Sequence, residues 1–252
     1  MPRARLHATN ADRQRAYRLQ KRLTALAPDI VCKTFGPCTV YRSDWQAIYP
    51  LLPRHAAVVT DPPYDAGYDV TQARRRPSQW TRNFEGYDQA FDPTPWLTFP
   101  EVILFGADHY RERLPAGGSW CFWDKTPGRQ PADFAPGELI WRSKAGPLQK
   151  FVHLWCGGMR AGEENHSRLP RKLHPAQKPI ALLLFLVQQI TAPVVIDPFM
   201  GSGTTLAACI RLGRPCIGIE MNPTYFETAC ARMQKELQQL PLFPHPTAEE
   251  NP

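Results

Sequence analysis

The stretch from Val194 to Ala208, VVIDPFMGSGTTLAA, decides the fold expected for the C-terminal third of this sequence. The apolar run up to Asp197 predicts a buried strand, and Thr204 to Leu212 predicts a helix that stops at Gly213. The glycines of the turn between them let a ligand approach the backbone, and the start of the helix offers free N–H donors. We therefore expect a ligand site at this turn.

The next predicted strand, CIGIE at 216–220, ends at Glu220, nineteen positions after Gly201. An acid at this place is typical of a carboxylate that holds both hydroxyls of a ribose. The turn is not a dinucleotide fingerprint, because Thr205-Leu206 stands where the third glycine would fall, and no Walker-type GK[ST] follows. The carboxylate of Asp197 favours a cationic or amine-bearing ligand over a phosphate.

Elsewhere, strands alternate with helices, a pattern that predicts a parallel α/β sheet. The expected strands are 39–41, 56–60, 102–105, 119–123, 138–142, 151–154, 194–196 and 216–219. Helices are expected at 45–52 as a short helix or turn, after Pro179, and from the capping pair Asn222-Pro223 to about Gln238.

A second motif, HAAVVTDPPY at 55–64, ends another apolar strand at a carboxylate. Asp61 is followed by Pro62 and Pro63, which fix the backbone, and then by the aromatic ring of Tyr64. Alone, this sequence could be a simple turn at a strand end. Together with the glycine turn, it favours a functional site.

DPPY, HPAQKP at 174–179 and DPFMGSGT at 197–204 together resemble the amino-methyltransferases of DNA, which use S-adenosylmethionine to methylate exocyclic base nitrogens. Because DPPY precedes the glycine turn, the chain resembles the permuted beta group, in which the target-recognition segment lies between the two motifs. FGADHYRERLPAGGSWCFWDK at 105–125 resembles phage and prophage members. The resemblance covers residues 39–233.

This resemblance implies an α/β, Rossmann-like methyltransferase fold with a mostly parallel twisted sheet flanked by helices. The motif order would be circularly permuted, with a small target-recognition insertion. We expect a basic N-terminal helix in residues 1–30, either solvated or contacting phosphate, and a catalytic domain at 31–238. The target-recognition segment would lie at about 126–173, and a flexible tail at 239–252.

The resemblance also implies residue roles. Asp61 and the Pro62 carbonyl would accept hydrogen bonds from the target amine, Pro63 would stiffen the motif, and a flipped base would stack on Tyr64. Glu220 would bind the ribose hydroxyls of the cofactor. Residues expected to line its methionine end are Asp197, Phe199, Gly201, Ser202, Gly203 and Thr204, with Lys178 near the methionine carboxylate.

Asp44 matches a family position near the adenine of the cofactor. The family's usual Gly-Asp-Cys is Ser43-Asp44-Trp45 here, so only the acid is kept. Members of the resembled family with Asp at the first position of this motif mostly act on the N6 of adenine, so the resemblance implies that target, and the N4 of cytosine is the alternative.

The net charge of +7 favours a polyanionic partner, here double-stranded DNA. Arg74, Arg75, Arg76 and Trp80 belong to the loop that the family layout places near the flipped base. Residues 142–172 hold seven Lys or Arg against two acids, which suits phosphate contacts. The sequence Gln239-Leu240-Pro241-Leu242-Phe243 resembles the peptide that docks bacterial DNA enzymes on the sliding clamp, unless its apolar residues pack back on the domain.

Other function classes fit less well. The longest apolar stretch, Ile180 to Val187, is too short to span a bilayer, and the N-terminus lacks a signal core, so we expect a cytoplasmic protein. Seven cysteines without a CxxC pair suggest neither a disulfide framework nor a zinc site. An NAD-dependent oxidoreductase would leave DPPY unexplained. A catalytically silent DNA-binding protein would explain the charge but not an intact DPPY.

Overall fold

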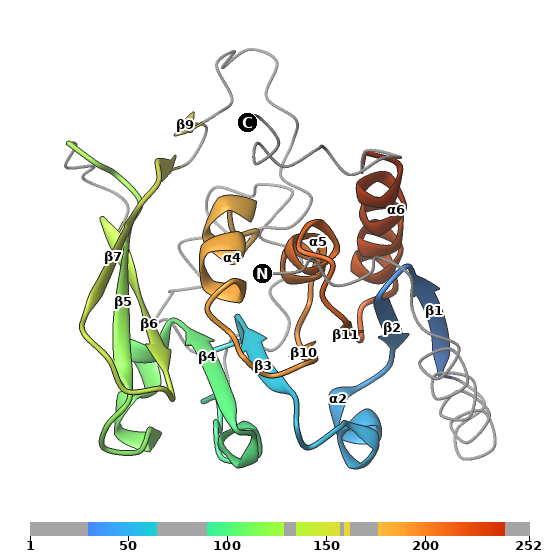
Figure 1. Cartoon of the computed structure of the whole chain (residues 1–252), viewed down its shortest axis with the longest axis horizontal. Helices are drawn as coiled ribbons and strands as arrows, with labels where there is room; N and C mark the ends of the chain where they lie inside the picture. The colour runs from blue at the N-terminus through green and yellow to red at the C-terminus, as the bar shows by residue number, and fades with distance from the viewer. Residues whose placement is uncertain (1–29, 65–89, 129–134, 157–158, 162–175, 240–252) are drawn as a thin grey trace, which may run out of the picture.

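The computed structural model describes residues 30–64, 90–128, 135–156, 159–161 and 176–239. They form a nine-stranded sheet of order β1-β2-β11-β10-β3-β4-β6-β5-β7 (Figure 1). The strands are β1 (Val31–Phe35), β2 (Cys38–Arg42), β3 (Ala57–Thr60), β4 (Glu101–Phe105), β5 (Ser119–Asp124), β6 (Gly137–Arg142), β7 (Gln149–Val152), β10 (Val195–Asp197) and β11 (Cys216–Glu220). A separate small pair joins β8 (Trp155–Cys156) to β9 (Met159–Arg160).

The five central strands, β2, β11, β10, β3 and β4, are parallel, which confirms the mostly parallel α/β sheet. β1 is antiparallel to β2, and β6 is antiparallel to both β4 and β5. β10 lies between β3 and β11, so a strand from the C-terminal third pairs directly with one from the N-terminal third. This insertion brings the two sequence motifs to the same edge of the sheet.

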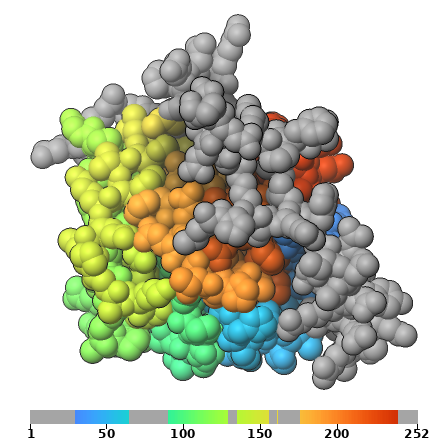
Figure 2. All heavy atoms as spheres, viewed as in Figure 1, coloured from blue at the N-terminus to red at the C-terminus, as the bar shows by residue number. Residues whose placement is uncertain are grey.

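Helices and 3-10 turns cover the two faces of the sheet. One face packs against α4 (Ile180–Val187), α5 (Thr204–Arg211) and α6 (Pro223–Gln239), which lie side by side in Figure 1. The other packs against α2 (Trp45–Ile48), η1 (Tyr49–Leu51), η2 (Trp96–Thr98) and η3 (Ala107–Arg113). Every residue of β3 is buried, because a central parallel strand has both faces covered. In the space-filling view, the orange atoms around α4 lie beside the yellow-green strands β5 to β7 (Figure 2).

Most predicted elements are present within a few residues of their expected bounds, and Asn222 caps α6 by accepting from the Thr224 N–H at 2.9 Å. β1 was not predicted. It forms a hairpin with β2 through Gly36, whose φ of +54° suits glycine. The segment expected to serve target recognition, 126–173, contributes β6 and β7 to the main sheet. A target-recognition role for the rest of that segment stays a prediction.

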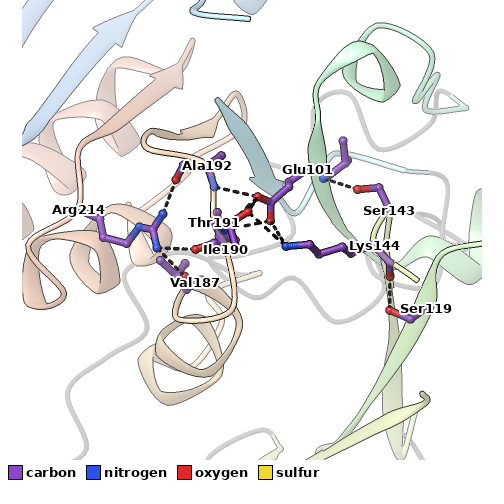
Figure 3. Close-up of polar contacts among 10 residues, drawn as sticks. Glu101, Ser119, Ser143, Lys144, Val187, Ile190, Thr191, Ala192 and Arg214 are labelled. Atoms are coloured by element: carbon purple, nitrogen blue, oxygen red, sulfur yellow. Dashed lines mark hydrogen bonds and ion pairs between the residues drawn. The ribbon is translucent and has the colours of Figure 1, made fainter. Parts of the chain in front are cut away.

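Charged side chains fix the segment that connects α4 to β10, at the edge of the sheet where β4 begins (Figure 3). Glu101 accepts hydrogen bonds from the backbone N–H groups of Thr191 at 3.0 Å and Ala192 at 2.8 Å. Arg214 approaches from the other side and donates to the carbonyls of Ile190, at 2.7 Å, and Ala192. These contacts fix the segment directly before β10. They therefore help to fix the position of Asp197, the last residue of this short strand.

The expectation of no disulfide is wrong for one pair. Cys38 of β2 and Cys216 of β11 form a disulfide in the buried core. They are directly paired in the parallel register, although 178 positions separate them in the chain. Spacing along the sequence could not show this, because the pairing arises only when β11 returns beside β2. Among the other cysteines whose side chains the structure describes, 32, 121, 209 and 230 are free.

Among the helices of the described residues, none combines the length and apolarity needed to cross a membrane.

Candidate active site

The two motif carboxylates lie at the carboxyl ends of neighbouring strands. β3 and β10 are paired in parallel, with Ala57 opposite Val195. Asp61 follows β3, and Asp197 is the last residue of β10. The Thr60 hydroxyl donates to Asp197 Oδ1 at 2.7 Å and links the two strand ends. The prediction that both motifs share one edge of one sheet is therefore confirmed.

The glycine turn wraps around the Asp197 carboxylate. The Phe199 N–H donates to Asp197 Oδ1 at 3.2 Å, so the carboxylate also holds the turn that follows it. Gly201 and Gly203 have φ values of +49° and +73°, a region that suits glycine. A Cβ on Gly203 would lie 2.9 Å from the Met233 side chain of α6, so this glycine also permits close packing.

Glu220 fixes the turn from the next strand. Its carboxylate accepts hydrogen bonds from the Gly201 N–H at 3.0 Å and the Asn222 N–H at 2.8 Å. Each carboxylate oxygen has a second lone pair, so Glu220 can still accept from hydroxyl groups of a ligand. Burial raises the pKa of Glu220, and the backbone N–H donors oppose that rise.

A cavity of about 620 Å³ opens between these strand ends. Its volume falls within the range usual for small-molecule sites, roughly 300–1,000 Å³. Most of the predicted site residues line it: Asp61, Pro63, Lys178, Asp197, Phe199, Gly201, Ser202, Thr204 and Glu220. These residues include three carboxylates and one lysine. The lining is therefore acidic and favours a cationic ligand.

Four predicted residues lie beside the cavity instead of lining it: Asp44, Pro62, Tyr64 and Gly203. Asp44 caps α2, where its carboxylate accepts from the Gln46 N–H at 2.9 Å. Its neighbours Ser43 and Trp45 do line the cavity. A role for Asp44 near an adenine ring thus stays a prediction, and Trp45 is an aromatic wall that sequence reasoning missed.

The Tyr64 ring lies against η3. It stacks on the His109 imidazole with a centroid separation of 4.7 Å and an angle of 18° between the planes. Gly106 leaves room for this ring, because a Cβ there would lie 2.2 Å from Tyr64 atoms. Tyr64 is therefore held in an ordered position directly after Asp61 and the two prolines.

A group of ion pairs connects Asp61 to Lys178, Glu138 and Lys125. Lys178 Nζ lies 2.6 Å from Asp61 Oδ2 and 3.2 Å from Glu138 Oε1, and Lys125 Nζ lies 2.6 Å from Glu138 Oε2. Sequence reasoning placed Lys178 near a methionine carboxylate and did not single out Glu138 or Lys125. No motif marks Glu138, which lies in a strand that only the folded sheet brings beside Asp61.

Burial shapes the ionisation of the site. It raises the pKa of Asp197 to about 6, against hydrogen bonds from Thr205, Thr60 and Phe199 that lower it. Burial also raises the pKa of Asp61, and the Lys178 ammonium opposes that rise. Burial alone would lower the pKa of Lys178, but the Asp61 and Glu138 carboxylates raise it above its ordinary value. The lysine is therefore charged at neutral pH.

Several predicted contacts lie outside the described residues. They are Arg74, Arg75, Arg76 and Trp80, the His174-Pro175 start of HPAQKP, and residues 240–243 of the clamp-like sequence. Gln239, the first residue of that sequence, is the last residue of α6.

Comparisons with known proteins agree with this site. Residues 139–231 match the model of a family described as DNA methylase, of the N6/N4 methyltransferases. One segment of 100 residues is 37% identical to the type II methyltransferase M.ScaI of Streptomyces caespitosus, over 38% of this chain and 33% of that protein. Another, of 68 residues, is 44% identical to the type II methyltransferase M.HpaI of Haemophilus parainfluenzae, over 26% of this chain and 22% of that protein. The chain thus matches about a third or less of the length of these relatives.

Among solved structures, the PvuII DNA methyltransferase, described as cytosine-N4-specific, aligns with a TM-score of 0.50 at 16% identity. The alignment covers 81% of this chain and 92% of that one. This likeness shows the methyltransferase fold predicted from the sequence.

Proposed function

We propose that this chain, whose residues 139–231 match the DNA methylase family model, transfers a methyl group from S-adenosylmethionine to an exocyclic amine of a base in DNA. The observation that carries the proposal is the shared edge of β3 and β10. There the DPPY carboxylate and the glycine turn line one cavity. A methyl donor bound at the turn and an amine held by Asp61 would therefore meet.

The residues present fit the proposed cofactor. S-adenosylmethionine carries a sulfonium and an ammonium, and the acidic lining suits both charges. Asp197 and the turn from Phe199 to Thr204 would hold the methionine end, where Phe199 offers a cation–π contact to the sulfonium. Glu220 would accept from the ribose hydroxyls while keeping its backbone hydrogen bonds. Lys178 is the candidate partner of the methionine carboxylate.

The bound cofactor would supply an electrophilic methyl group, so that the target nitrogen forms a C–N bond as the S–C bond breaks. The amine is a poor nucleophile because its lone pair is delocalised into the base. Hydrogen bonds accepted by Asp61 and the Pro62 carbonyl favour a more pyramidal and more nucleophilic nitrogen. The two prolines keep both acceptors in place, which leaves little ordering to be done during reaction. One proton leaves the nitrogen through its hydrogen bond to Asp61 and passes to water.

The base must leave the duplex, because its amine is otherwise paired. Tyr64 is the proposed stacking partner, and such stacking contributes roughly 1–3 kcal/mol per base. The adenine N6 is the proposed target, on the resemblance of DPPY to adenine-specific motifs, and the cytosine N4 is the alternative. An NAD-dependent oxidoreductase or a silent DNA-binding protein would not need a DPPY carboxylate on the lining of the cofactor cavity.

Double-stranded DNA is the proposed partner. Arg74, Arg75, Arg76 and Trp80 are its proposed contacts near the flipped base, and the basic part of 142–172 would contact phosphates. Docking on the sliding clamp through Gln239 to Phe243 is a separate prediction. A pulldown with purified clamp tests it, with Leu242→Ala and Phe243→Ala together as the control that should lose binding.

The central test is transfer of a tritiated methyl group from S-adenosylmethionine to DNA, followed by analysis of the digested nucleosides. We expect N6-methyladenine; N4-methylcytosine would instead identify the alternative base. Asp61→Ala should lower kcat by at least about 100-fold while S-adenosylmethionine still raises the Tm. Asp92→Ala, a change at an exposed carboxylate, is the matched control. No transfer by the wild type, or Tm stabilisation by NAD in place of S-adenosylmethionine, would overturn the proposal.

A further inference from the structure

Four charged side chains from separate elements form a buried row of ion pairs that begins at Asp61. Lys178 precedes α4, Glu138 lies in β6, and Lys125 follows β5. The side chains of Lys178 and Glu138 are only 12% and 7% exposed. Buried charges persist in proteins when they are paired, and breaking one pair leaves an uncompensated charge. A change at Lys125 should therefore affect Glu138, then Lys178 and finally Asp61, because each is paired with the next.

Lys178 is shared between two carboxylates. Its Nζ is 2.6 Å from Asp61 Oδ2 and 3.2 Å from Glu138 Oε1. The Phe105 ring, whose centroid is 5.3 Å from the same nitrogen, covers it further. Because the lysine is bonded to Oδ2, Asp61 Oδ1 keeps its acceptor capacity for an incoming amine. Lys178 thus fixes the direction of the Asp61 carboxylate without taking the place of the target.

Among the residues that the structure describes, the charged and titratable groups that interact with Asp61 include Lys178, Glu138, Lys125, Asp197 and Tyr110. Burial and the Glu138 charge favour the protonated form of Asp61, whereas the two lysines favour the carboxylate. Lys125 acts on Glu138 directly, at 2.6 Å, and so limits how strongly Glu138 competes for Lys178.

We propose that Glu138 and Lys178 are positioning residues for methyl transfer: Glu138 holds Lys178, and Lys178 keeps Asp61 ionised and aimed at the target amine. This inference rests on the proposed function. Glu138 is not among the residues that line the cofactor cavity, so it acts through Lys178 and not on the cofactor. A residue with this role affects the reaction rate and its pH dependence more than cofactor binding.

The test is the pH profile of kcat/KM for DNA in three variants. Lys178→Met removes the cation, so the acid limb of the profile should move to higher pH by about one unit or more. Glu138→Gln removes the competing carboxylate and leaves Lys178 to Asp61 alone, so the limb should move to lower pH. Glu138→Gln should also lower kcat several-fold at the plateau with an unchanged KM for S-adenosylmethionine. Lys33→Met is the control: Lys33 pairs with Glu227 at 2.9 Å and is not among the cavity-lining residues, so this variant should keep the wild-type profile.

A merely structural role would not give shifts of opposite sign. If Lys178→Met fails to fold, Lys125→Met should move the acid limb of the profile in the same direction. Without Lys125, Glu138 attracts the Lys178 ammonium more strongly, and Asp61 is stabilised less. Shifts in the same direction, or Glu138→Gln with wild-type kcat and profile, would overturn this inference while the proposed function stands. Absence of methyl transfer by the wild type would overturn both.

Discussion

Asp197 combines deep burial with an acidic group whose ordinary pKa is 3.8 and whose pKa in the fold is about 6. Between these values the folded protein binds a proton that the unfolded chain releases. The resulting stability is fully present below pH 3.8 and is lost as the pH rises through about 6. At neutral pH the ionised carboxylate therefore destabilises the ligand-free fold. A cationic ligand at the turn would offset that cost.

The change Asp197→Asn tests this trade-off. The Asn side-chain oxygen can still accept from Thr60 and Phe199, and no charge remains to be buried. We expect the ligand-free variant to be more stable at pH 8, by up to about 3 kcal/mol, and equal to the wild type near pH 4. Stabilisation by S-adenosylmethionine should be lost. Thermal unfolding between pH 4 and 8, with and without the cofactor, measures both effects. A variant less stable than the wild type at pH 8 contradicts the argument.

At the scale of elements, the glycine turn depends on its packing against α6. Gly203 has a φ of +73°, and an added Cβ would also lie 3.2 Å from Ala229 Cβ. Gly203→Ala should lower the free energy of unfolding by about 1–3 kcal/mol, from the left-handed backbone and the contact together. Gly128→Ala is the matched control, because its φ is +71° and no atom of the described residues is recorded within 4 Å of the added Cβ. Urea unfolding of both should show the larger loss for Gly203→Ala; equal losses would rule out a packing contribution.

The loop after DPPY gives a prediction about DNA. Replacing Arg74, Arg75 and Arg76 with Glu should weaken DNA binding and flatten its dependence on salt, because fewer counterions are released. Fluorescence anisotropy with labelled duplex at several salt concentrations measures both quantities. Binding of S-adenosylmethionine, followed by its effect on Tm, serves as the control and should not change. An unaltered salt slope would remove this loop from the interface.

For the whole molecule, the disulfide between β2 and β11 closes most of the described chain into one loop. Reduction should lower the free energy of unfolding by about 2–4 kcal/mol. We expect the Tm to fall when dithiothreitol is added to the wild type but not to a variant with both Cys38→Ala and Cys216→Ala. Cys209→Ala, a change at a free buried cysteine, should keep the response to reductant. A wild-type Tm that ignores reductant would show that the two sulfurs are not joined.

The sequence alone determined the elements that carry the site. Local rules sufficed, because apolar runs end at Asp61 and Asp197, glycines mark the turn, and Asn222 caps the last helix. The resemblance supplied the expected fold, and the shared edge of β3 and β10 agrees with it. These local features depend on residues that are close together in the chain, so the sequence pattern is enough to predict them.

Only the tertiary structure decided what distant segments do together. Cys38 meets Cys216 because β11 returns beside β2, and Glu138 meets Lys178 because β6 inserts between β4 and β5. Asp44 and Gly203 lie beside the cavity: the Asp44 carboxylate caps α2, and Gly203 packs against α6. Such contacts depend on strand order and side-chain direction, so their physical cause is long-range packing, which spacing along the chain does not encode.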